Sequence, residues 1–224
     1  EASAIQINLR DKVQVQPLPD EIHLVIGTSV AIDPNNDTIH AALVVLRFPD
    51  MELVERHGLS EKITFPYVRG LLAFREAPPL MKLMKRIQHK PDVILFHSHG
   101  LAHPRRFGLA SHLGVLFDIP SIGVADRVLV GYHDDIDSEK GHHAPLIHNG
   151  EEIGLALRTK EGVSPMFISV GHKADLLTTM DFTLECTTHY RRPEPIRQAH
   201  LAVEAQRDGE SIDIDVGGDQ TTLF

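Results

Sequence analysis

The stretch VILF (Val93–Phe96), followed directly by HSHG (His97–Gly100), decides the fold class. Four apolar residues without interruption are typical of a strand that is buried on both faces in the middle of a sheet. A second run of this kind, SIGVA (Ser121–Ala125), comes after a segment with helical character. In an open α/β sheet, ligands collect at the carboxyl ends of the strands. We therefore take His97 and Asp126, which follow the two runs, as candidate functional residues.

The residues before this stretch predict three strands in antiparallel order. The turn-forming sequence DPNN (Asp33–Asn36) separates the apolar runs Ile22–Ile32 and His40–Phe48, which predicts a hairpin. A third strand is expected over Met51–Arg56. Three antiparallel strands followed by helix, strand, helix and strand predict an α/β fold with a mixed central sheet and helices on both faces.

A helix is predicted between the third strand and VILF. Apolar residues between Leu80 and Ile87 recur with the spacing of one helix face, and Pro78 and Pro79 are tolerated near a first turn. Glu76 would then precede the helix, where the helix dipole favours a carboxylate. Further elements are expected as helices over His103–Phe117, near Lys173–Thr187 and over Pro195–Arg207, and as a strand pair over Ile153–Arg158 and Met166–Val170.

Composition limits the classes of function. Among 224 residues, 31 are Asp or Glu and 22 are Lys or Arg, and the net charge of −9 argues against a surface that is basic all round. The single cysteine, Cys186, excludes an internal disulfide and a four-thiolate zinc site, and it fits a reducing compartment. Metal chemistry would have to use oxygen and the 15 histidines. No apolar run is long enough for a membrane span and the start lacks a signal peptide, so we expect a cytoplasmic protein with no membrane partner.

The end of the chain differs from the rest. Asp208–Phe224 holds five acidic residues, no basic residue and two adjacent glycines, which predicts a flexible acidic tail after a single domain over residues 1–207. Its last residues look like the short motif with which bacterial repair proteins bind the DNA sliding clamp. In that motif Gln220 would set the register and the apolar pair Leu223 and Phe224 would enter a groove.

Four runs of this sequence together match one known family: FPYVRGLLAFREAPPL (Phe65–Leu80), KPDVILFHSHGLAHPRRFGLASHLG (Lys90–Gly114), IPSIGVA (Ile119–Ala125) and RRPEPIRQAH (Arg191–His200). They closely resemble the endonuclease V family. This resemblance implies a ribonuclease H-like fold and an enzyme that uses magnesium or manganese to cut DNA or RNA near deaminated purines, chiefly inosine.

The catalytic positions implied by the resemblance are only partly kept. Glu76 and His200 match the family's glutamate and late histidine. Ser29 and His97 stand where the family has metal-binding aspartates, and Asp126 stands where it has a lysine. A hard cation prefers anionic oxygen, which neither a hydroxyl nor a neutral imidazole supplies.

The positions that the resemblance assigns to nucleic-acid recognition are better kept. Pro66, Tyr67, Val68 and Arg69 resemble the family's strand-separating wedge, although its last residue is normally a proline. Ser98 replaces a glycine of the pocket for the flipped base. The other matching pocket residues are Gly70, Leu72, Gly108, Leu109, Ala125 and Leu129, and the candidate phosphate contacts are Arg105, Arg106, Arg191, Arg192 and Arg197.

Three hypotheses follow. In the first, the protein still engages nucleic acid with deaminated purines but has lost most or all of the magnesium-dependent cleavage, with or without a bound metal. In the second, it is an active nuclease with a rebuilt site in which Glu76, His97, Asp126 and His200, with His99 as a further candidate, bind manganese, iron or zinc. In the third, it is an adaptor that its tail recruits to the sliding clamp.

Overall fold

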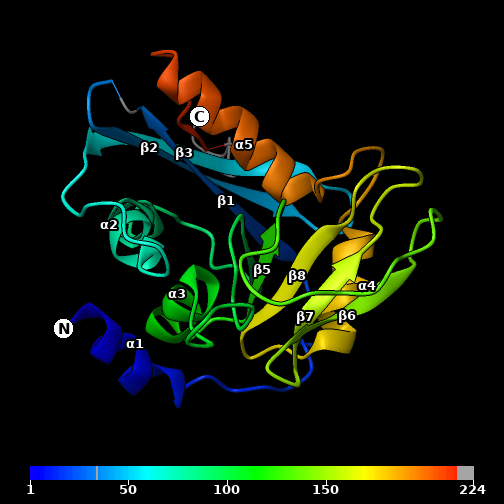
Figure 1. Ribbon diagram of the computed structural model, residues 1–224. Helices are drawn as coiled ribbons and strands as arrows, with labels where there is room; N and C mark the ends of the chain where they lie inside the picture. The colour runs from blue at the N-terminus through cyan, green and yellow to red at the C-terminus, as the bar shows by residue number, and fades with distance from the viewer. Residues whose placement is uncertain (34, 216–224) are drawn as a thin grey trace.

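The computed structural model describes residues 1–33 and 35–215, and these form a mixed sheet with helices on both faces (Figure 1). Within the described residues the strand order is β6-β7-β8-β5-β4-β1-β2-β3-β9. The strands are β1 (Leu24–Asp33), β2 (Thr38–Arg47), β3 (Glu52–Lys62), β4 (Val93–Phe96), β5 (Ser121–Ala125), β6 (His143–His148), β7 (Glu151–Leu157), β8 (Met166–His172) and β9 (Ile214–Asp215).

The centre of the sheet confirms the predicted topology. β1 pairs antiparallel with β2, and β2 with β3, as the hairpin signals predict. β4 lies parallel to β1 on one side and to β5 on the other, and all four of its residues are buried. β5 then pairs antiparallel with β8. A buried strand between two parallel neighbours explains the uninterrupted apolar run VILF.

Helices cover the two faces of the sheet and create a hydrophobic core on each (Figure 1). On one face, buried leucines of α2 and α3 pack on Ile94 and Phe96 of β4. On the other, α4 and α5 pack on Val93 and Leu95, which alternate with the first pair along the strand. The helices are α1 (Ala2–Arg10), α2 (Leu72–Met84), α3 (Leu109–Phe117), α4 (Leu176–Glu185) and α5 (Glu194–Arg207). None of these helices is both long and apolar enough for a bilayer crossing.

Helix α2 begins earlier than predicted. Ala77 and Ala73 continue the buried face of Leu80 backwards by one and two turns, and the helix starts at Leu72. The prediction that Glu76 precedes the helix is therefore wrong, because Glu76 lies within it. Pro78 and Pro79 also lie inside the helix rather than near its first turn.

Other elements also differ from the prediction. β3 continues to Lys62, beyond the expected end at Arg56. The segment 103–108 is a loop in which Arg106 has a positive φ of 56°, and α3 begins only at Leu109. β6 (His143–His148) was not predicted, because a strand with Pro145 at its middle and histidines at both ends carries little β signal.

The described part of the acidic tail is attached to the sheet. Ile212 is buried in the core, and β9 pairs with β3 at Arg56 and Glu55. This differs from the expectation of a tail that leaves the domain at Asp208. The clamp-like residues Gln220, Leu223 and Phe224 lie outside the described residues.

Candidate functional site

Three of the five candidate catalytic residues meet where the parallel pairing of β1, β4 and β5 ends. Ser29 lies on β1, His97 directly follows β4, and Asp126 directly follows β5. The Ser29 Oγ atom lies 3.4 Å from Nδ1 of His97, and Nε2 of His97 lies 2.8 Å from Oδ2 of Asp126. Because the carboxylate accepts from Nε2–H, Nδ1 of a neutral His97 carries the lone pair that faces the serine hydroxyl.

Asp126 is also bound by two arginines from the loop before α5. Arg191 Nη1 lies 2.7 Å from Oδ1, and Arg192 Nη2 lies 2.7 Å from Oδ2. Burial opposes the charge of Asp126, but hydrogen bonds from His97 and Arg192 outweigh it and hold the pKa of this carboxyl far below its ordinary value. Asp126 is therefore an ionised carboxylate, and both of its oxygens accept hydrogen bonds from protein groups.

His200 of α5 lies beside this network without a hydrogen bond to it. Its ring is 6.1 Å from the ring of His97, edge to face. Burial lowers the pKa of His200, and the positive charge of Arg192 lowers it further. The only ion-pair partner of its Nε2 within the described residues is Glu204, at 3.6 Å.

Glu76 has no hydrogen bond to the network among the described residues. Its carboxylate has no hydrogen bond to any residue in the described part of the chain. Burial raises the pKa of Glu76 to about 8, although the neighbouring Arg75 opposes this shift. At neutral pH the side chain is mostly an uncharged acid.

These side chains do not fit a bound metal ion. Both ring nitrogens of His97 and both carboxylate oxygens of Asp126 have protein partners, and the arginines at Asp126 would repel a cation. No group of three or more His, Cys, Asp or Glu is arranged to hold a metal ion within residues 1–33 and 35–215. The proposed rebuilt site of Glu76, His97, Asp126 and His200 thus finds no support in the geometry.

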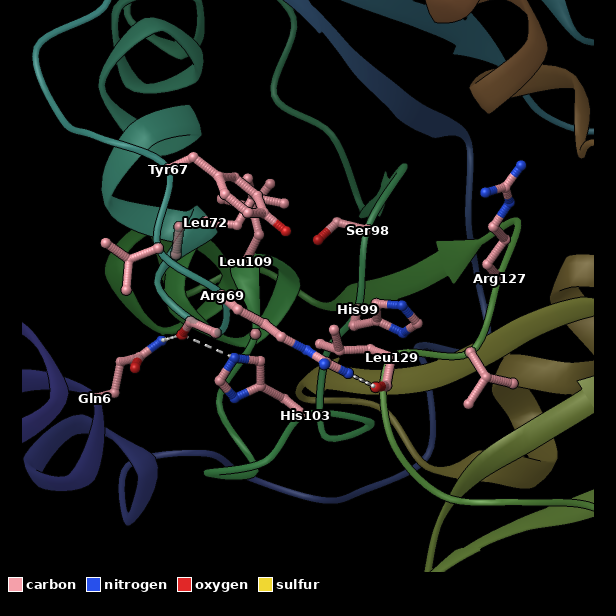
Figure 2. Close-up of a pocket in the computed structure, with 15 residues that line it drawn as sticks. Gln6, Tyr67, Arg69, Leu72, Ser98, His99, His103, Leu109, Arg127 and Leu129 are labelled. Carbon is pink, nitrogen blue, oxygen red and sulfur yellow. Dashed lines mark hydrogen bonds between the residues drawn. The ribbon is translucent and has the colours of Figure 1, made fainter.

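A cavity of about 440 Å³ lies next to the network, because its lining includes Ser98 and Arg127, which directly follow His97 and Asp126. Figure 2 shows the side chains that line it. The exposed side chain of Tyr67 lies at the mouth of the cavity and points towards Ser98. Leu72 and Leu109 form an aliphatic wall. Burial lowers the pKa of His99 to about 4, so this lining residue is neutral. The other predicted pocket residues that line it are Val68, Arg69, Gly70, Gly108 and Leu129.

Two residues that the sequence analysis did not assign to the pocket, Gln6 and His103, help to hold Gly70 in the cavity lining. The carbonyl of Gly70 accepts hydrogen bonds from Gln6 Nε2, His103 Nε2 and the guanidinium of Arg105. Gln6 is buried on α1, which brings the start of the chain to the cavity. An isolated glutamine in an otherwise unremarkable segment gives no sequence signal for this role.

Some predicted residues lie elsewhere. Pro66 and Ala125 are not among the cavity's lining residues. Arg105 donates hydrogen bonds to Gln6 Oε1 and to the Gly70 carbonyl. Arg106 forms an ion pair with Glu151 at 2.8 Å, and Arg197 forms one with Glu194. These three guanidiniums are engaged within the protein, so the geometry does not favour them as phosphate contacts.

The chain is similar to known proteins over most of its length. Residues 7–201 match the family profile described as Endonuclease V. A protein of that name from Rippkaea orientalis is 45% identical over 199 residues, which cover 89% of this chain and 87% of the relative. The crystal structure of Endonuclease V from Streptomyces avermitilis has a TM-score of 0.89 and 40% identity, with 93% of this chain and 92% of that one covered.

A third similar structure contains nucleic acid. Endonuclease V from Ciona intestinalis, solved with a DNA that contains an inosine followed by a ribo-adenosine, has a TM-score of 0.80 and 28% identity to this chain. The match covers 92% of this chain and 96% of the other.

Proposed function

Because this chain belongs to the endonuclease V family, we propose that it recognises deaminated purines, chiefly inosine, in DNA or RNA, with the family's magnesium-dependent cleavage lost or much reduced. This proposal is carried by the network in which Ser29 contacts His97, His97 contacts Asp126, and two arginines bind Asp126. Ser29 and His97 stand at the two positions where the family resemblance implies metal-binding aspartates. Within such a network a divalent cation would have to displace two guanidinium groups from one carboxylate. That exchange is unfavourable because the carboxylate would lose its charge-assisted hydrogen bonds and the cation would lie close to two positively charged guanidinium groups.

The recognition side of the proposal is supported by the cavity and its exposed wedge. Flipping a base costs a few kcal/mol of unstacking, and an aromatic ring that fills the gap offsets part of this cost. Tyr67 is 69% exposed at the cavity mouth, so its ring is available for such stacking. The Ciona relative binds inosine-containing DNA, and the present chain shares its fold over nearly its whole length.

The test is a cleavage assay coupled to a binding assay. Strands of DNA and RNA with one inosine are incubated with magnesium, manganese, iron or zinc, and binding is measured by fluorescence anisotropy. We expect no cutting with magnesium, tight binding of the inosine strand, and a loss of about tenfold in affinity in Tyr67→Ala, since base stacking on an aromatic side chain contributes about 1–3 kcal/mol.

Cleavage in the presence of a transition metal would instead indicate a rebuilt active site. Cutting with a transition metal that Glu76→Ala and His97→Ala both abolish would overturn the loss of cleavage. The clamp hypothesis is a separate prediction: the pull-down of a bacterial sliding clamp should depend on residues 220–224, and retention after their deletion would remove its support.

A further inference from the structure

A second cavity lies beside the first, and its lining is rich in arginine. It measures about 550 Å³ and is lined by Asp126, Arg127, Val163, Ser164, Arg191 and Arg192. With three guanidiniums against one carboxylate, its lining carries a surplus of two positive charges. Such a surplus in a concave site attracts anions.

The two tethered arginines have different roles. Arg191 donates from Nε to the Ser164 carbonyl and from Nη2 to the carbonyls of Pro165 and Asp126, in addition to its ion pair. Each of its three guanidinium nitrogens therefore has a hydrogen-bond partner within the protein, and its role is structural. Arg192 donates only to Asp126, from Nε and Nη2, and its Nη1 group has no partner within the described residues.

Asp126 holds Arg192 in place before any ligand arrives. A free arginine side chain loses rotamer entropy when it is fixed. The two hydrogen bonds from Arg192 to Asp126 have already fixed its guanidinium, so a ligand that reaches Nη1 does not incur that cost again.

Arg127 lines both this cavity, which we call the arginine cavity, and the first cavity, which is lined by Leu72 and Leu109 and which we call the base cavity. Its side chain is exposed and has no hydrogen bond to another described residue. Figure 2 shows it directed away from the aliphatic wall that Leu72 and Leu109 form. Arg127 therefore lies between the leucine wall of the first cavity and the other two arginines of the second.

We propose that the arginine cavity binds a phosphodiester group of the strand through Arg127 and Arg192, and that it does so without a divalent metal. This inference rests on the proposed function, since it names the backbone contact of the same site. Asp126 serves as a positioning residue that takes the place of a metal in organising the anion site. Guanidinium groups suit this task because their planar fork matches phosphate oxygens.

The experiment measures the affinity for two labelled single strands, one with inosine and one with adenosine at the same position, in EDTA and over a series of salt concentrations. We expect Arg192→Gln and Arg127→Gln each to weaken the binding of both strands by about fivefold to tenfold. Each should also reduce the slope of log affinity against log salt by about 0.7. The inosine preference should stay as in the wild type, and magnesium should not change the affinity.

The matched control is Arg47→Gln, which removes the same charge from an exposed arginine (60% side-chain exposure) at the opposite end of the sheet. If Arg127→Gln, which breaks no internal hydrogen bond, behaves like this control, the phosphate site is wrong while an inosine preference would still uphold the proposed function. Equal binding of both strands by the wild type would overturn the proposed function but not the phosphate site. Binding that EDTA abolishes, or no binding of either strand, would overturn the inference.

Discussion

At the scale of single residues, the site is governed by which atoms already have partners. His103 shows this clearly. Its Nε2–H donates to the Gly70 carbonyl at 3.0 Å, and its Nδ1 accepts from the Arg105 amide at 3.2 Å. Both ring nitrogens are committed to the neutral form, because a proton on Nδ1 would point at an N–H group. Burial lowers the pKa of His103 to about 4, and the charge of Arg105 adds to this.

The first prediction concerns this histidine and pH. The folded-state pKa lies below the ordinary value of 6.5, so the unfolded chain binds more protons between pH 6.5 and 4. Stability is therefore full above pH 6.5 and falls as pH drops towards 4. At pH 5 the loss from His103 should be about 1–2 kcal/mol, and His103→Gln should show a shallower decline between pH 7 and 5 in urea unfolding.

The control for this prediction is His142→Gln, which changes an exposed loop histidine. It should keep the wild-type slope. A slope in His103→Gln as steep as in the wild type would mean that His103 does not set the acid sensitivity.

At the scale of elements, the packing of α5 on β1 brings His200 of the helix near Ser29 of the strand. The two elements touch at Gly27, where an added Cβ would lie 1.9 Å from the carbonyl oxygen of Pro195. No side chain fits in that gap without moving the helix away from the strand. The glycine is thus a packing requirement, and its negative φ makes no special backbone demand.

The second prediction is that Gly27→Ala destabilises the fold by about 3 kcal/mol or more, because overpacking against backbone cannot be relieved by a rotamer change. Gly150→Ala is the comparison, since Gly150 has a positive φ of 78° but open space around it. Its cost should be only about 1 kcal/mol of backbone strain. Chemical denaturation measures the free energy of unfolding of both variants. Equal losses of stability would show that β1 and α5 can move apart at little cost.

The third prediction concerns Glu55 of β3, whose side chain is fully buried. Burial opposes its charge, but hydrogen bonds from His57 and His89 and from the Gln88 and His89 amides lower its pKa. The stabilisation is therefore present above the ordinary pKa of 4.5 and is lost as pH falls below it. Glu55→Gln should cost about 2–4 kcal/mol at pH 7 in thermal or urea unfolding. Glu52→Gln, at an exposed position of the same strand, should cost almost nothing, and equal losses would contradict the prediction.

These elements also show what the sequence could predict. β4 and β5 were predicted to the residue, because a strand buried on both faces has no polar interruption. The start of α2 was missed because two prolines masked a helix that extends on both sides of them. The resemblance predicted replacements at Ser29, His97 and Asp126, whereas it did not predict the hydrogen bonds from the two arginines to Asp126. That pairing joins residues 65 positions apart, and no local pattern encodes it.

At the scale of the whole molecule, the basic cavities belong to a chain with a net charge of −9. Five acidic residues and no basic ones lie after residue 207, so the remainder carries a charge of only −4. The sheet places the arginine cavity and the base cavity side by side, with Arg127 common to both. The proposed strand binding would therefore use one face of the sheet, where the two cavities adjoin.

The fourth prediction is that restoring two carboxylates should restore a metal site. In the double variant Ser29→Asp with His97→Asp, two new charges face Asp126, one of them at a position that is only 1% exposed. Without metal this variant should be less stable than the wild type. Manganese at about 100 times its dissociation constant should stabilise it by about 2.7 kcal/mol. For a protein of this size that corresponds to a rise of about 5–10 °C in melting temperature.

The isosteric variant Ser29→Asn with His97→Asn separates charge from shape, because it has the same side-chain sizes without the carboxylates. It should show no manganese-dependent rise, and neither should the wild type, whose Asp126 is held by Arg191 and Arg192. A rise in the wild type would mean that its own His and carboxylate groups bind the ion, which would revive the rebuilt nuclease. If instead the double aspartate variant shows no rise, the arginine pair blocks the ion by itself, and Arg192→Leu added to that variant should then release the site.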